Sequence, residues 1–176
     1  ITVGERVAGR LGSMAVYAGA LTAGQAALLG TAGSAYPTLR PLTWAGTAGD
    51  AAWNTSSLNW TASGSAATFA TGDSPTFDDS ASATTVDIPA AVTTSQFAFA
   101  NATKAYTLQG SGSVEALSGM TKSGAGQLTL AVPVRVQGGA TFSSGTVRVG
   151  NGGTAGSLAG DVALASGATL AFDRSD

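Results

Sequence analysis

The sequence predicts an all-β protein whose short strands stack as the coils of a solenoid. From about Thr84 onward, apolar residues alternate with small polar residues, which is the period of a β-strand. Glycine supplies 25 of the 176 residues, and each glycine inside a helix would cost about 1 kcal/mol relative to alanine. Apolar pairs recur 19 and 23 positions apart near the C-terminus, a spacing typical of one solenoid coil.

Residues 1–35 form a separate segment with the pattern of a secretory signal. Arg6 and Arg10 precede an uncharged run at 11–30, and small residues follow it up to Ala35. We expect cleavage after Ala35. The alternative is an Ala-rich amphipathic helix, because glycines and a glutamine make the run weakly hydrophobic for a membrane span. Both interpretations predict a helical N-terminal segment.

Residues 36–82 carry three tryptophans among turn-forming residues. Trp44, Trp53 and Trp60 are too widely spaced for one face of a short strand, and Gly, Ser, Asn and Asp lie between them. We therefore expect an N-terminal cap of irregular strands. The tryptophans are interpreted as closing one end of an elongated core. The alternative is an exposed platform on which sugar rings stack, as in a carbohydrate-binding module.

Residues 83–176 are predicted to be the rungs of the solenoid. Their apolar pairs are Leu128 with Leu130, Val147 with Val149, and Leu170 with Phe172, with shorter strands around Val134, Val136, Val162 and Leu164 between them. Such a repeat buries its apolar side only against neighbouring rungs. Because the chain begins with Ile1 and the pattern is still running at Asp176, we expect further rungs beyond this sequence.

Composition excludes several classes of function. Charged residues make up 10% of the chain and the net charge is −2, which is too weak a field to attract nucleic acid or an anionic membrane surface. The sequence contains no Cys and no His, which excludes cysteine nucleophiles, Cys/His zinc sites and the Ser-His-Asp triad. Any catalysis would have to use carboxylates, Lys, Ser or Tyr.

The carboxylates are therefore the candidates for a site. Asp73, Asp78, Asp79 and Asp87 lie in a stretch without Lys or Arg, and such a group could bind Ca²⁺ or provide the acid and base of a polysaccharide-cleaving enzyme. The other interpretation makes Asp73 with Ser74 a cap or turn, and makes Asp78 and Asp79 solvated turn residues. We favour the second interpretation, and we predict no catalytic, cofactor-binding or metal-binding residues.

Other motifs carry weaker signals. Asn-x-Ser/Thr triplets begin at Asn54, Asn59 and Asn101, and they matter only if the source glycosylates asparagine. Lys122 is predicted to be an outward positive residue at a turn, because Ser and Gly follow it. The run GNGGTAG at 150–156 lacks the third glycine of a dinucleotide-binding fingerprint.

Three motifs follow one another near the C-terminus. They are MTKSGAGQLTL at 120–130, GGAT at 138–141 and GTVRVG at 145–150. In this order they closely resemble the autotransporter-associated β-strand repeat of bacterial type V secretion passengers. Residues 131–137, AVPVRVQ, depart from the family, which usually has an Asn-rich turn there. From about residue 42, the upstream chain is similar to the segment that precedes these repeats in many passengers.

The resemblance implies a right-handed parallel β-helix that is exported to the bacterial cell surface. It also implies a C-terminal β-barrel translocator in the same protein, which would anchor the passenger in the outer membrane. We expect a structural stalk that serves adhesion to host cells, matrix or neighbouring cells, or self-association. We expect no cofactor and no nucleic-acid partner. The alternative function is a polysaccharide-cleaving or carbohydrate-binding β-helix.

Overall fold

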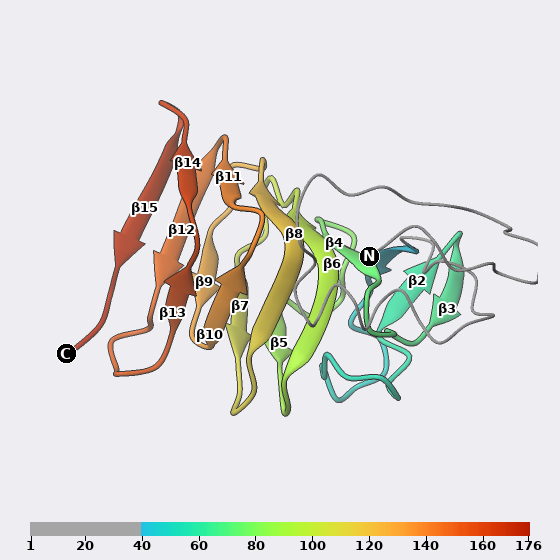
Figure 1. Cartoon of the computed structure of the whole chain (residues 1–176). Coiled ribbons are helices and arrows are strands. Elements are labelled where there is room, and N and C mark those ends of the chain that lie inside the picture. The colour runs from blue at the N-terminus through green and yellow to red at the C-terminus, as the bar shows by residue number, and fades with distance from the viewer. Residues whose placement is uncertain (1–39) are drawn as a thin grey trace, which may run out of the picture.

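The computed structural model describes residues 40–176, and the helical segment predicted for residues 1–35 lies outside this range. Within the described residues all regular elements are β-strands. They coil into a parallel β-solenoid of about four turns. The prediction of an all-β solenoid is therefore confirmed. Figure 1 shows the coils side by side along the long axis of the molecule, with the C-terminal strands at one end.

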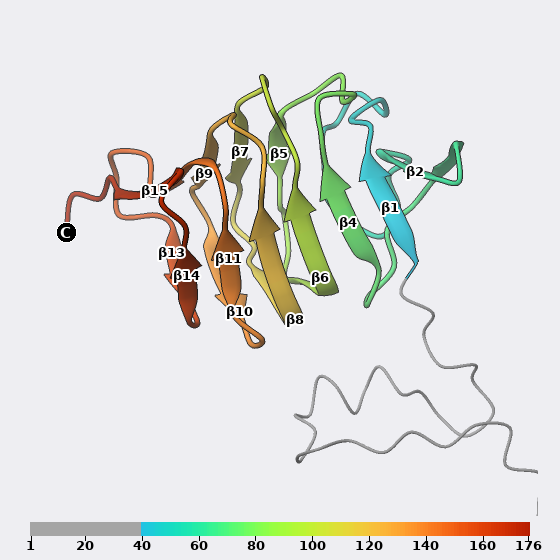
Figure 2. The ribbon, with the colours of Figure 1, turned by 90° about the horizontal axis from the view of Figure 1, so that it is seen from above.

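The coils form two sheets, which lie on opposite sides of the core (Figure 2). Sheet A has ten strands: β1 (Pro41–Trp44), β2 (Trp60–Ala62), β3 (Ser65–Ala67), β4 (Ser74–Phe77), β6 (Val92–Phe99), β8 (Val114–Lys122), β10 (Pro133–Val136), β11 (Ala140–Phe142), β13 (Ser157–Ala159) and β14 (Val162–Leu164). Sheet B has five strands: β5 (Thr85–Asp87), β7 (Tyr106–Gln109), β9 (Leu128–Leu130), β12 (Gly145–Val149) and β15 (Ala168–Phe172).

The register of sheet B confirms the repeat expected from the apolar pairs. Leu128 is aligned with Val147, and Val147 with Leu170. The second residues of the pairs are aligned in the same way, up to Phe172 beside Val149. Parallel strands in register place equivalent side chains directly above one another, so the alternating pattern becomes continuous apolar columns inside the coil.

Sheet A is less regular than sheet B, because two of its rungs are split. The long strand β6 pairs with the long strand β8. On the next rung β8 pairs with two short strands, β10 and β11, and these pair in turn with β13 and β14. The break between β10 and β11 falls at Gly138 and Gly139. A Cβ atom at Gly138 would lie 1.6 Å from the carbonyl oxygen of Ser118, so only glycine permits this close approach of neighbouring rungs.

One end of the solenoid is closed by a cap. There β1 pairs in parallel with β4 on one side and antiparallel with β2 on the other, and β2 pairs antiparallel with β3. Trp44 at the end of β1, Trp60 at the start of β2 and Trp53 between these strands are fully buried, and the ring centroids of Trp44 and Trp60 are 4.8 Å apart. The interpretation that the tryptophans close the core is confirmed. The alternative of an exposed tryptophan platform is wrong.

Candidate functional site

Asp73 is part of the framework of the cap rather than of an open carboxylate cluster. Its carboxylate is buried and accepts hydrogen bonds from Arg40 Nε at 3.0 Å and from Nη2 at 2.6 Å. It also accepts one from the backbone N–H of Ala70 at 2.7 Å, so a turn is present as predicted. The hydrogen bond to Asp73 also raises the pKa of Arg40. The ion pair links the residue before β1 to the turn before β4.

Asp78 and Asp79 have different roles at the turn after β4. Asp78 Oδ1 accepts the backbone N–H of Ser80 at 2.8 Å, which is the local turn predicted from the sequence. Asp79 instead reaches the next coil, where its oxygens accept the backbone N–H groups of Ala102, Thr103 and Lys104. These hydrogen bonds lower the pKa of Asp79 to about 2. The prediction of a merely solvated Asp79 is wrong, because this carboxylate connects two rungs.

The four aspartates are distributed around the coil and do not form one site. Asp73 precedes β4, Asp78 and Asp79 follow it, and Asp87 ends β5 in the opposite sheet. In residues 40–176 no group of three or more acidic, Cys or His side chains is arranged to hold a metal ion. The turn interpretation therefore fits the geometry better than a shared calcium or acid–base site.

Lys122 is buried, and the prediction of an outward residue at a turn is wrong. It is the last residue of β8, and it is aligned with Phe99 on one side and Phe142 on the other. Its side chain is fully buried in this inward ladder, and Nζ donates a hydrogen bond to the carbonyl oxygen of Gly124. Burial lowers the pKa of Lys122. Met120 and Lys122 are two positions apart in β8, so their side chains point to the same face of the strand. This spacing from an apolar residue is the sequence signal that indicates an inward Lys122.

Two of the three Asn-x-Ser/Thr triplets carry asparagines that are fully buried. The Asn59 amide donates to Asp50 Oδ1 at 2.5 Å and to the carbonyl of Ala52 at 3.0 Å. The Asn101 amide donates to the carbonyls of Lys104 and Gln127, at 2.5 and 3.1 Å. In the folded chain these side chains are structural groups, and neither is accessible for glycosylation.

A groove, which we call the sheet A groove, lies on the outer face of sheet A. It has a volume of about 270 Å³. It crosses four rungs, and it is lined by Ser74, Pro75, Thr76, Gln96, Phe97, Ala98, Ser118, Gly119, Met120, Thr121, Gly138, Gly139 and Thr141. The lining contains no charged side chain. A β-bulge between Thr94 and Gln96 shifts the pairing of β6 with β8 beside the groove.

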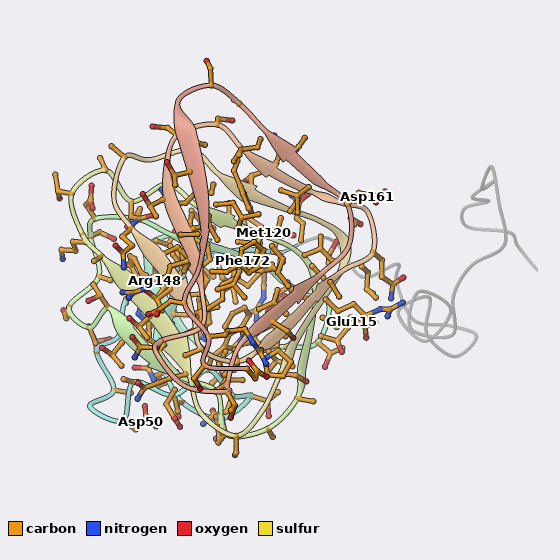
Figure 3. The ribbon with its side chains drawn as sticks, turned by 90° about the vertical axis from the view of Figure 1, so that its left-hand side faces the viewer. Asp50, Glu115, Met120, Arg148, Asp161 and Phe172 are labelled. Atoms are coloured by element: carbon orange, nitrogen blue, oxygen red, sulfur yellow. The ribbon has the colours of Figure 1, made fainter. Side chains whose placement is uncertain are left out.

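Two further hollows lie nearer the C-terminal end of the same face, on either side of Arg135. They measure about 350 and 340 Å³. Arg135 Nε lies 3.8 Å from Glu115 Oε1, while Gln137 donates to the same oxygen at 2.7 Å. In Figure 3, Glu115 and Asp161 lie on the same side of the coil. These groups form a mixed-charge surface outside the sheet A groove.

Comparison with known proteins found no matching family model, no similar curated protein and no similar solved structure. Among residues 40–176 there is no helix long and apolar enough to cross a membrane. The class that the geometry defines is thus a capped parallel β-solenoid with a polar groove on one sheet.

Proposed function

We propose that this chain is the N-terminal part of the passenger of a bacterial autotransporter. In this proposal residues 40–176 form a right-handed β-helical stalk with its cap, and a β-barrel translocator in the same protein carries it to the cell surface. The stalk serves adhesion to host cells, matrix or neighbouring bacteria, or self-association. No catalytic role is assigned to it.

The observation that carries this proposal is the position of the repeat motif in the coil. Gly124 and Gly126 occupy a corner, where a Cβ atom would lie 2.0 Å from the carbonyl oxygen of Asn101 and 2.3 Å from that of Lys104. Leu128 then follows as a fully buried residue of β9. The glycines and leucines of the family motif thus coincide with the positions that stacking requires.

The surface also supports a role in extended contacts. Only 10% of the residues are charged, and Ser and Thr side chains face solvent along the stacked coils. A rod of this kind offers many hydrogen-bonding groups spread along its length. Such a surface suits adhesion to another surface better than the enclosed pocket that an enzyme requires.

The proposal is tested in the cell that produces the full-length protein. Intact cells are treated with protease, and the released fragments are weighed by mass spectrometry. We expect a surface-derived fragment that begins near Tyr36. A strain lacking residues 40–176 should adhere and aggregate less than the parent, and complementation with the intact gene should restore both properties.

Two results would contradict the proposal. The first is a protein that stays protected inside the cell with residues 1–35 attached, which would exclude the secretion route. The second is a deletion strain that adheres and aggregates like its parent while its other surface proteins are unchanged. That result would leave the fold intact as a finding and would exclude adhesion as the function of this segment.

A further inference from the structure

The exposed part of the sheet A groove is polar and neutral. Gln96, Ser118, Thr121 and Thr141 are exposed, whereas the apolar lining residues, such as Phe97 and Met120, are buried. A ligand in the groove therefore meets hydroxyl, amide and backbone groups together with some aliphatic surface, such as the half-exposed Ala98, and it meets no charged side chain. This lining is unsuited to phosphates, nucleic acids and acidic polymers.

The polar groups of the groove repeat along the solenoid axis. Thr76, Ala98, Thr121 and Thr141 are aligned on consecutive rungs, and neighbouring rungs are about 4.8 Å apart. Each threonine hydroxyl can both donate and accept a hydrogen bond. Thr76, Thr121 and Thr141 thus offer hydroxyls on three of the four rungs, and the exposed Gln96 supplies an amide on the rung of Ala98. This arrangement complements a ligand that is itself a chain of hydroxyl-bearing units.

A second observation points to the same place. Ser74 is one of the residues that line the groove, and within the described residues its hydroxyl oxygen is buried without a hydrogen-bond partner. Buried polar groups are nearly always satisfied by protein, water or ligand. Gly119, Gly138 and Gly139 leave the neighbouring lining without side chains, so a ligand can approach the backbone closely.

The geometry points to a glycan-binding site: we propose that the sheet A groove binds a neutral, polyhydroxylated chain that lies across the rungs of β4, β6, β8 and β11. An added peptide strand does not fit there, because these strands pair with neighbours on both sides. Binding is on the order of millimolar for a short oligosaccharide, because no aromatic face is exposed among the residues that line the groove. The inference is independent of the secretion route and holds for any protein with this surface.

The test is a titration of the isotope-labelled 176-residue chain followed by backbone amide NMR. The probes are the neutral hexasaccharides of β-1,4-glucose, α-1,4-glucose, β-1,4-xylose and β-1,4-N-acetylglucosamine, with hexagalacturonate as the anionic comparison. We expect saturable shifts for at least one neutral hexasaccharide, confined to amides around Thr76, Gln96, Thr121 and Thr141. Hexagalacturonate is expected to bind more weakly than that sugar.

Matched variants separate the groove from the rest of the surface. Thr121→Val with Thr141→Val removes two aligned hydroxyls while keeping a β-branched residue in each strand, and we expect binding at least about tenfold weaker. Thr85→Val with Thr107→Val removes an aligned pair from sheet B, and its affinity should stay within about twofold of the original.

Three outcomes would overturn the proposal. One is the absence of saturable shifts with every neutral hexasaccharide up to about 20 mM, which exceeds the expected range of affinity. Another is an equal loss of binding in the sheet B variant. The third is tighter binding of hexagalacturonate than of any neutral probe, which would assign the surface to an acidic ligand instead.

Discussion

The two ends of the solenoid differ in whether their inward aromatic side chains are covered. At the N-terminal end, Trp53 is fully buried and packs against Trp60 of β2 and Phe69. At the C-terminal end, Phe172 is aligned with the buried Val149, yet it is 71% exposed because no strand of the described chain stacks on β15. The comparison shows that burial in a solenoid depends on the next rung as well as on the sequence pattern.

The cap also differs in how it is held together. Its aromatic rings pack edge to face, with the Trp53 and Trp60 centroids 5.4 Å apart, and an ion pair between the half-buried Arg40 and the buried Asp73 joins its two segments. At the open end Arg174 pairs with Asp176, whose side chain is 48% exposed. The stabilising interactions are therefore concentrated at the closed end, and substitutions at the two ends should have unequal effects.

The largest effect is expected at the centre of the cap. Trp53→Ala removes a ring that packs against Trp60, Phe69, Phe77 and Phe97, and it should lower the free energy of unfolding by about 3–5 kcal/mol. Phe172→Ala, the matched aromatic substitution at the open end, should change it by less than about 0.5 kcal/mol. Urea denaturation measures both values. Equal losses would show that the open end is covered in solution.

The next effect concerns the ion pair of the cap. Asp73→Ala leaves the Arg40 guanidinium and the Ala70 N–H without their partner, and it should cost about 1–3 kcal/mol of unfolding free energy. Asp176→Ala at the open end serves as the control, and its denaturation midpoint should stay close to the original because Asp176 is exposed and exposed pairs contribute little. A Tm of Asp73→Ala equal to that of the parent chain would exclude the structural role of this pair.

A smaller effect of opposite sign is expected within the coil. Lys122→Met replaces a buried amine with an apolar chain of similar length and should raise the unfolding free energy by about 1 kcal/mol at neutral pH. Because burial lowers the pKa of the native Lys122, the original chain gains stability as pH rises toward the ordinary value of 10.5. The advantage of the variant should therefore shrink at alkaline pH. An advantage that grew with pH would contradict this account.

The smallest effect is a change in acid sensitivity. The pKa of Asp79 is about 2 in the folded chain, whereas the ordinary pKa of this carboxyl is 3.8. The resulting stabilisation is present above about pH 4 and is lost as pH falls to about 2. In Tm measurements between these pH values, Asp79→Asn should show a shallower fall than the original chain. Asp176→Asn, at the open end, should retain most of the original slope.

Local pattern was sufficient for much of the fold. Alternation and glycine content predicted the strands, and the apolar pairs predicted the register of sheet B, because each of these depends on residues close in sequence. The candidate site was less predictable. The partner of Asp73, the backbone contacts of Asp79 and the groove between Thr76 and Thr141 all join residues from different coils, and a sequence pattern carries no direct record of such contacts.

Lys122 shows where local reasoning was insufficient even within one strand. The Ser and Gly that follow it are typical of a turn, and a positive charge normally faces solvent. The tertiary structure extends β8 to this residue and aligns it with Phe99 and Phe142. The alternation of the strand therefore places Lys122 inside the coil, although lysine usually faces solvent. Burying the amine is unfavourable, and its hydrogen bond to the carbonyl of Gly124 offsets part of that cost.

By itself the sequence determined that the chain forms short strands, repeats with a coil-length period, and can bury its apolar faces only by stacking, because strand period and glycine spacing act locally. Tertiary structure alone decided how the tryptophan rings pack against one another, that Lys122 is buried, which backbone groups Asp79 binds and where a groove opens. These features depend on how neighbouring coils are aligned, and that alignment exists only once the chain has folded.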